Sequence, residues 1–212
     1  MATADRREQD RARRKQEILL AARAVFVQVG FRRATVDAVA RRAEVGKGTI
    51  YLYFENKEAI LAELLLQALG ELAGQLQAAS DSCPVLHPDQ RLRALADAYL
   101  AFVQNAPDYF WLLNAFDRGD FQQGISPQRR EQLFAVSHHT LELVRQAIAD
   151  GMALEMFAPG DAWLAAGVLW AALNGALALM ANPIRRTLVA TDLPTFYHAT
   201  VEAFLRGLRR EV

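Results

Sequence analysis

Two short apolar faces on either side of a tight turn, within residues 35–54, constrain the fold of this chain more than any other feature. In the first half, apolar side chains recur at i, i+3, i+4 and i+7 and so share one face of a helix: Val36, Val39, Ala40 and Ala43. Thr35 stands just before them, where its hydroxyl can accept a backbone N–H at the helix start. The pattern predicts a short helix that packs on one side.

The turn and the second helix follow directly. The run Glu44-Val45-Gly46 interrupts the period, and Gly46 can begin the next helix at little cost. Val45 supplies the apolar plug that such a turn needs. Ile50 and Phe54 then fall at i and i+4, so we expect both to point inward.

The outward face of the second helix has a different character. It carries Lys47, Gly48, Thr49, Tyr51 and Leu52. One cation, hydroxyl groups and a bare glycine make a poor hydrophobic surface, but they suit phosphates and base edges. Two short helices in this order have the size of a helix-turn-helix, which lays its second helix in the DNA major groove.

A third helix is predicted ahead of this pair, over Arg11–Val29. Its apolar stripe comprises Ile18, Ala22, Val25, Phe26 and Val29. Gly30 is a good helix stop, and Phe31 is an expected anchor into the small core. Three helices in so few residues make a compact head, which we expect to lean on the long helix that follows.

Several short motifs occur here with a shared spacing: Phe26…Gly30-Phe31, Thr35-Val36, Val39-Ala40, Val45-Gly46-Lys47-Gly48-Thr49-Ile50-Tyr51 and Tyr53-Phe54-Glu55-Asn56-Lys57-Glu58. Through them, residues 14–61 closely resemble the amino-terminal domain of TetR/AcrR-type transcriptional regulators. The resemblance covers about the first quarter of the chain, and the rest matches the family only in being helical and in length. It implies a homodimeric regulator, usually a repressor, that leaves its operator when a small molecule enters the second domain.

The resemblance also assigns roles to single residues. Thr35 and Thr49 stand where the family commonly contacts phosphates, and Tyr53 and Lys57 stand at further backbone contacts. Three residues lie where the family approaches bases: Lys47, Gly48 and Tyr51.

Two residues depart from the family pattern. Glu44 replaces a glycine often found in the turn, which costs about 1–2 kcal/mol if the backbone there is left-handed. Asp37 stands where some members place a basic or polar base reader, so it either repels phosphate or caps its own helix.

Charge is distributed unevenly although the formal net charge is +0. Residues 1–60 carry 13 Lys and Arg against 8 Asp and Glu, whereas residues 61–212 carry 11 against 16. A basic end on an acidic body favours attraction to phosphates. The Arg-rich residues 1–13 are expected to form a flexible basic tail that adds nonspecific attraction to DNA, or else a solvated extension of the first helix.

The rest of the chain is predicted to be helical, punctuated by Pro and Gly. The expected helices are 58–80, 89–105, 107–118, 127–154, 161–182 and 194–210. The fold class is therefore all-α, with a DNA-binding domain at residues 14–60 and an effector-binding and dimerisation domain at 61–212. The start of the chain is charged rather than apolar, and the single Cys83, expected in a loop, suits a reducing cytoplasm.

The segment from Trp163 to Ala181 is apolar nearly all round. Its length is close to that of a membrane span, but its glycines and Asn174 favour a buried helix. A helix of this kind must be covered on every side, and a second subunit is the expected cover, with intrachain packing as the alternative. The predicted dimer interface comprises Trp163, Gly167, Ala171, Ala178, Phe204 and Leu208.

An aromatic cluster in the middle of the chain is the expected effector pocket, because ligand cavities are mostly apolar with few polar groups. Its members are Tyr99, Phe102, Tyr109, Trp111, Phe134 and Trp170, with Asn114, His138 and Asn174 as polar anchors. The alternative is that these aromatic residues simply fill a core. The cluster favours a hydrophobic or aromatic effector.

No catalytic, metal or cofactor site is predicted. His138 and Glu142 form an i, i+4 pair, but a third metal ligand is not evident. The sequence thus predicts a cytoplasmic, ligand-released repressor that binds a palindromic DNA operator as a homodimer. The alternatives are an activator or effector-independent DNA binder, and a helical binding protein or enzyme with a vestigial head.

Overall fold

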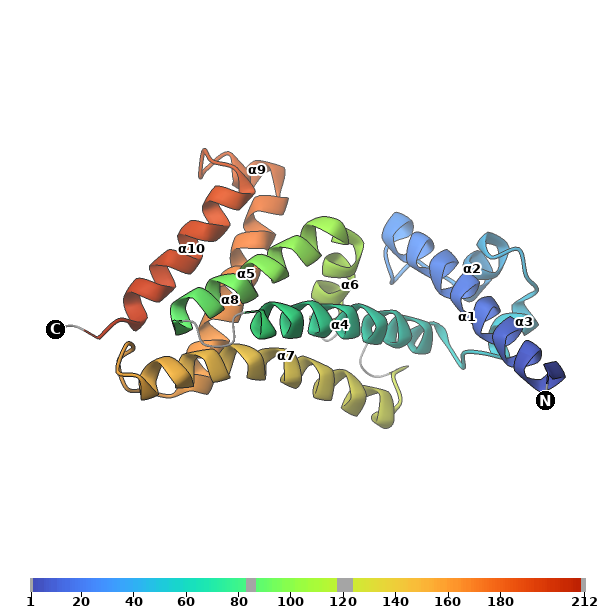
Figure 1. Cartoon of the computed structure of the whole chain (residues 1–212). Helices are drawn as coiled ribbons and strands as arrows, with labels where there is room; N and C mark the ends of the chain where they lie inside the picture. The colour runs from blue at the N-terminus through green and yellow to red at the C-terminus, as the bar shows by residue number, and fades with distance from the viewer. Residues whose placement is uncertain (1, 83–86, 118–123, 211–212) are drawn as a thin grey trace. The chain divides into compact units, whose positions relative to one another are not determined.

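The structure is a computed structural model that describes residues 2–82, 87–117 and 124–210. In those ranges no β-sheet forms, and the all-α prediction is confirmed (Figure 1). The helices are α1 (Ala2–Val29), α2 (Val36–Arg42), α3 (Lys47–Tyr51), α4 (Lys57–Asp81), α5 (Pro88–Asn105), α6 (Pro107–Asp117), α7 (Pro127–Ala153), α8 (Ala162–Ala181), α9 (Pro183–Arg186) and α10 (Leu193–Leu208). Cys83, which was expected in a loop, lies outside the described residues.

The first helix is longer than its apolar stripe required. Residues 1–13 were expected to be a flexible tail or a solvated helix extension, and from Ala2 onward they continue α1. This segment contains neither Gly nor Pro and is rich in Arg and Ala, which have high helix propensity. Gly30, at φ 79°, then ends the helix in the left-handed conformation that glycine adopts most easily.

The turn between α2 and α3 has the predicted geometry. Thr35 caps α2, with the backbone N–H of Ala38 donating to its Oγ1 at 3.1 Å. Glu44 has a φ of 55°, so the left-handed strain considered for this position is present. Gly46 is the extended residue at the start of α3, and Val45 packs against the core.

The chain divides into two compact units. Unit 1 comprises residues 1–71 and 103–136, and unit 2 comprises residues 72–102 and 137–212. The core of unit 1 contains the residues predicted to point inward from the head, including Ile18, Phe26 and Ile50. Leu112, Ile125 and Leu133 extend this core, so α6 and the start of α7 share it with the three head helices and the first half of α4. The functional boundary between residues 60 and 61 stays a prediction.

Ion pairs join the helices of unit 1. Glu63 of α4 binds both Lys15 of α1 and Arg129 of α7, the latter at 2.5 Å. Burial opposes ionisation of Glu63, but the hydrogen bonds from Arg129 and Lys15 outweigh it and lower its pKa. Arg23 of α1 binds Asp108 of α6 at 3.1 Å.

Unit 2 is held by packing of α8 against α10. Tyr197 of α10 is fully buried, and its hydroxyl donates to the carbonyl of Ala96 in α5 at 2.9 Å. Arg93 of α5 binds Glu202 of α10 at 2.6 Å. The four-residue α9 was not predicted. It forms because Asn182 caps it and Pro183 occupies its first position, where a missing N–H is tolerated.

Candidate nucleic-acid interface

The exposed face of α3 is the feature of unit 1 that sequence and structure agree on most closely. Ile50 is fully buried and Phe54 is 2% exposed, so these two side chains fix the helix to the core. Tyr51 is half exposed, and Lys47 and Gly48 face solvent beside it. A helix of this length, anchored on one side and polar on the other, presents its side chains to an external partner.

Lys47 has a partner that the sequence did not predict. Its ammonium group donates to Asp37 of α2 at 2.9 Å. This hydrogen bond raises the pKa of Lys47. Asp37 therefore neither stands alone as an acid nor caps α2, which is capped by Thr35. A cation and an anion together occupy the surface where α2 meets α3.

Lys57, predicted to contact the DNA backbone, is engaged inside the head. Its Nζ donates to the carbonyl oxygens of Phe31, Arg32 and Ala34 at 3.1, 3.3 and 3.1 Å. It also lies 4.7 Å from the centre of the Phe31 ring. These contacts tie the start of α4 to the segment between α1 and α2, so Lys57 orders the loop that leads into Thr35.

Thr49 lies on a neighbouring side of α3, and Tyr53 follows the end of that helix. Both are half-buried, and together with Leu52 they line a groove against the start of α1. The Arg11 guanidinium lies 5.8 Å from the centre of the Tyr53 ring. Sequence analysis missed Arg11 as a site residue, although its spacing from Arg7 and Arg14 is helical.

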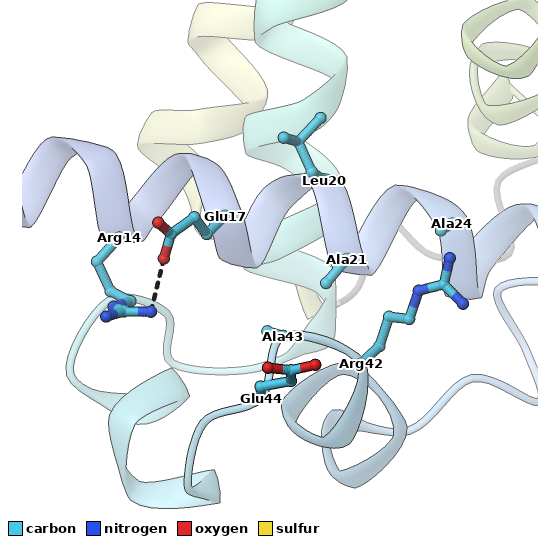
Figure 2. Close-up of a pocket in the computed structure, with 8 residues that line it drawn as sticks. All are labelled: Arg14, Glu17, Leu20, Ala21, Ala24, Arg42, Ala43 and Glu44. Carbon is cyan, nitrogen blue, oxygen red and sulfur yellow. Dashed lines mark hydrogen bonds and ion pairs between the residues drawn. The ribbon is translucent and has the colours of Figure 1, made fainter.

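A second hollow lies between α1 and α2, with a volume of about 550 Å³ (Figure 2). Arg14 lies toward one end of it and Arg42 toward the other, with Glu17 and Glu44 between them. Arg14 is already bound to Glu17 at 2.6 Å. Two cations and two anions give this hollow no preference for a ligand of either sign, so we assign it none.

The predicted effector residues are divided between the two units. Tyr109, Trp111 and Phe134 belong to unit 1, and Trp111 and Phe134 are 49% and 69% exposed. The side chain of Asn114 lies outside the described residues. The remaining members belong to unit 2: Tyr99, Phe102, His138, Trp170 and Asn174.

Three of the effector residues in unit 2 form one chain of hydrogen bonds. The Tyr99 hydroxyl donates to Asn174 Oδ1 at 2.8 Å, and Asn174 Nδ2 donates to the carbonyl of Trp170 at 2.9 Å. Phe102 is buried in the core, whereas His138 contacts Trp163 with ring centres 4.7 Å apart. The structure thus brings Tyr99, Trp170 and Asn174 together and places His138 with an interface candidate.

Two of the predicted interface residues on α8, Ala171 and Ala178, lie along one exposed apolar stripe, and Trp163 and Gly167 lie beside it. Its members recur at spacings of four and three residues: Leu164, Val168, Ala171, Gly175 and Ala178. The opposite face packs inside unit 2 through Leu169, Leu173 and Leu177. Trp163 is 39% exposed, Ala171 and Ala178 are exposed, and Gly167, Phe204 and Leu208 are partly buried.

Among the residues that the structure describes, two helices, α4 and α8, are long and apolar enough to cross a membrane by length and composition alone. In α4, 56% of the most apolar 18-residue stretch is buried within the protein, as is usual for a core helix. In α8 the share is 33%, which leaves apolar surface to be covered by something else.

An anchored, outward-facing α3 on a three-helix head is the arrangement of a helix-turn-helix DNA-binding domain. Residues 18–64 match the family of bacterial regulatory proteins described as the tetR family. The match lies within the three-helix head and the start of α4, so this amino-terminal domain is of the tetR-family type.

Two curated regulators are similar to this chain over a segment of about the same length as the head. The chain is 48% identical over 59 residues to the HTH-type transcriptional regulator YhgD of Bacillus subtilis. It is 38% identical over 61 residues to the fatty acid metabolism regulator protein of the same organism. These matches cover 28% and 29% of this chain and 31% of each relative, so the chain spans about a third of the curated relatives it matches.

Solved structures extend the likeness of fold to nearly the whole chain. The TetR family transcriptional regulator PfmR of Thermus thermophilus superposes with a TM-score of 0.73 at 24% identity, over 92% of this chain and 96% of that one. The regulator FadR of Bacillus subtilis, in complex with stearoyl-CoA, superposes with a TM-score of 0.72 at 18% identity, over 92% and 99%.

Proposed function

We propose that this protein is a homodimeric, cytoplasmic repressor that binds a palindromic operator through α3 and leaves it when a largely hydrophobic effector binds unit 2. The observation that carries the proposal is the half-exposed Tyr51 beside Lys47 on a helix whose other side is locked into the core by Ile50 and Phe54. Side chains held this way can enter a major groove without rearrangement of the head.

The contacts divide by chemistry. Lys47, Gly48 and Tyr51 approach base edges, where the absence of a β-carbon at Gly48 lets the backbone come close. Thr35, Thr49 and Tyr53 donate hydroxyl hydrogen bonds to phosphates. Lys57 acts through the three carbonyl groups that it holds, because these fix the loop that carries Thr35.

The exposed stripe of α8 supports the dimer. Apolar residues at alternating four- and three-residue spacings on a helix are typical of a seam against another helix. Ala171, Gly175 and Ala178 are small, so a partner helix can approach closely there. A second copy that packs α8 against α8 and brings α10 alongside covers the apolar surface that one chain leaves exposed.

Release follows from a shift between two populations. In the dimer the two α3 helices lie roughly 34–36 Å apart when each occupies a half-site. An effector that binds better to a form with another spacing draws the protein off DNA, and only by that difference in affinity. In unit 2, Tyr99, Asn174 and Trp170 form a hydrogen-bonded set of polar and aromatic groups, and we assign effector contacts to this set. The stearoyl-CoA in the FadR structure supports an effector with a long apolar part.

The proposal is tested by selecting genomic fragments on the purified protein and measuring affinity for the best fragment and for a scrambled one. We expect a two-fold symmetric site, a dimer in solution, and release by one member of a panel of aromatic and long-chain compounds. A reporter fused to the fragment should rise when the gene is deleted, whereas a fall indicates an activator. Equal affinity for both fragments contradicts the proposal.

A further inference from the structure

The first four turns of α1 lie outside the core of the head. The first core residue of the helix is Ile18, and every described side chain from Arg6 to Arg13 is exposed. Most helical stability in proteins comes from burial of an apolar face, which this segment lacks. The segment therefore presents its side chains to solvent along one edge of α3.

A groove of about 670 Å³ separates this segment from α3. One wall carries Arg7, Asp10, Arg11, Arg13 and Arg14, and the other carries Thr49, Leu52 and Tyr53. Thr49 of α3 and the two residues that follow the helix, Leu52 and Tyr53, fall at i, i+3 and i+4, beside the face that carries Lys47 and Tyr51. The groove is thus continuous with the proposed base-reading surface and is lined by four arginines.

The arginines of the groove differ in their partners. Arg13 binds Asp10 at 3.2 Å and Arg14 binds Glu17 at 2.6 Å. Within the part of the chain that the structure describes, the ion pairs do not include Arg7 or Arg11. These two fall at i and i+4 on one face of α1, and Arg11 lies over the Tyr53 ring. Two guanidinium groups with free donors, next to hydroxyls of Thr49 and Tyr53, suit a phosphate.

We propose that Arg7 and Arg11, with Thr49 and Tyr53, form a second DNA site that grips the phosphate backbone flanking the bases read by α3. This rests on the proposed function, since it adds a backbone contact to the same DNA surface. The site carries no base specificity, so it strengthens binding to any sequence and lengthens the stretch of duplex that each head covers. A regular array of phosphates is favoured over an acidic peptide because the groove adjoins the reading helix.

The test compares wild type with the Arg7→Gln/Arg11→Gln double variant. Both side chains are exposed and Gln has a similar helix propensity, so the head is expected to fold. The matched control is Arg130→Gln/Arg206→Gln, which removes two exposed charges elsewhere. Fluorescence anisotropy titrations at several KCl concentrations give the affinity and its salt slope for the selected fragment and for a scrambled one.

The site predicts that the double variant loses affinity for both fragments by the same factor. Its salt slope falls by about 1.8 per head, since each neutralised phosphate contributes about 0.9, and the control keeps the wild-type slope. An unchanged slope in the double variant, or an equal fall in the control, overturns the proposal.

Two further outcomes distinguish this proposal from the proposed regulator function and from a protein-docking surface. A wild-type protein that binds both fragments equally contradicts the proposed regulator function, yet the slopes still report on the groove. A labelled poly-glutamate peptide serves as the probe for a protein partner. If the double variant loses that peptide while its DNA affinity matches wild type, the groove is a protein-docking surface and the DNA assignment is wrong.

Discussion

Lys47, the first residue of α3, donates a hydrogen bond to Asp37, the second residue of α2, across 2.9 Å. Both side chains are about half exposed, at 50% and 52%. The pair therefore stands on the surface proposed to meet DNA, and a carboxylate engages the Lys47 ammonium group there. Contact with DNA requires Lys47 either to leave Asp37 or to carry it toward the phosphates.

Replacing Asp37 with Asn removes the anion and releases Lys47. We expect affinity for scrambled DNA to rise several-fold, and the salt slope to steepen by about 0.9 per head, because the DNA-facing surface of each head loses one negative charge. Specificity should fall because binding to every sequence improves. Anisotropy titrations check this, with Asp81→Asn on α4 as a control that removes an exposed charge elsewhere. An Asp37→Asn protein that behaves like this control shows that the pair has no part in binding.

Replacing Lys57 with Met removes the donor to three loop carbonyls. Hydrogen bonds of charged groups contribute roughly 1.5–3 kcal/mol, so we expect a loss of about 2 kcal/mol in the free energy of unfolding of the head. Urea unfolding followed by circular dichroism measures it. The control is Lys47→Met, an exposed change expected to cost less than about 0.5 kcal/mol. Equal stability of the two variants contradicts a positioning role for Lys57.

The pairing of Glu63 with Lys15 and Arg129 makes the stability of unit 1 sensitive to acid. Its pKa in the folded protein lies below the ordinary value of 4.5, so its contribution is present above that pH and is lost as pH falls through the folded pKa. Glu63→Gln should therefore destabilise the protein by about 1–2 kcal/mol at neutral pH.

The difference between the two proteins should shrink toward zero as the pH falls below the lowered pKa of Glu63 in the folded protein. Urea unfolding of both proteins at neutral and acidic pH measures it. A difference that stays constant with pH would mean that Glu63 acts through packing alone.

Aspartate at Ala171 or Ala178 places a charge in the exposed stripe of α8. Both positions face solvent in the single chain, so the fold of unit 2 should survive while association is lost. Analytical ultracentrifugation at micromolar concentration should show monomers for these variants and dimers for wild type. Ala135→Asp, an equally exposed change on α7, should remain dimeric. Dimers in all three variants place the interface elsewhere.

The sequence predicted the helices well because their signals are local. Helical periodicity and the placement of Pro and Gly located α4 to α8 and α10 to within two residues at most boundaries. The left-handed backbone at Glu44 was raised only as a condition, from the glycine that the resembled family often has there, and its φ of 55° meets that condition. The exception, α9, is a single turn with no apolar face to reveal it.

The contacts of individual side chains could not be predicted from the sequence in the same way. Periodicity tells which face of a helix is apolar, but not which neighbour meets it. For this reason Tyr99 and Tyr109 appeared to belong to one cluster, although they fall in separate units. Lys57 resembled a solvated phosphate ligand because its carbonyl partners depend on where the loop at Phe31 lies in space.

Tyr51 gives the most direct test of the central claim, that the exposed face of α3 reads a specific DNA sequence. The measurement is the ratio of affinities for the best genomic fragment and a scrambled one, at fixed salt, for wild type and Tyr51→Ala. Specific regulators favour their site by about 10³-fold or more, so we expect a ratio of that order for wild type. In Tyr51→Ala the ratio should fall by at least tenfold, while the dimer and the nonspecific affinity persist. A ratio that is the same in both proteins would contradict the account.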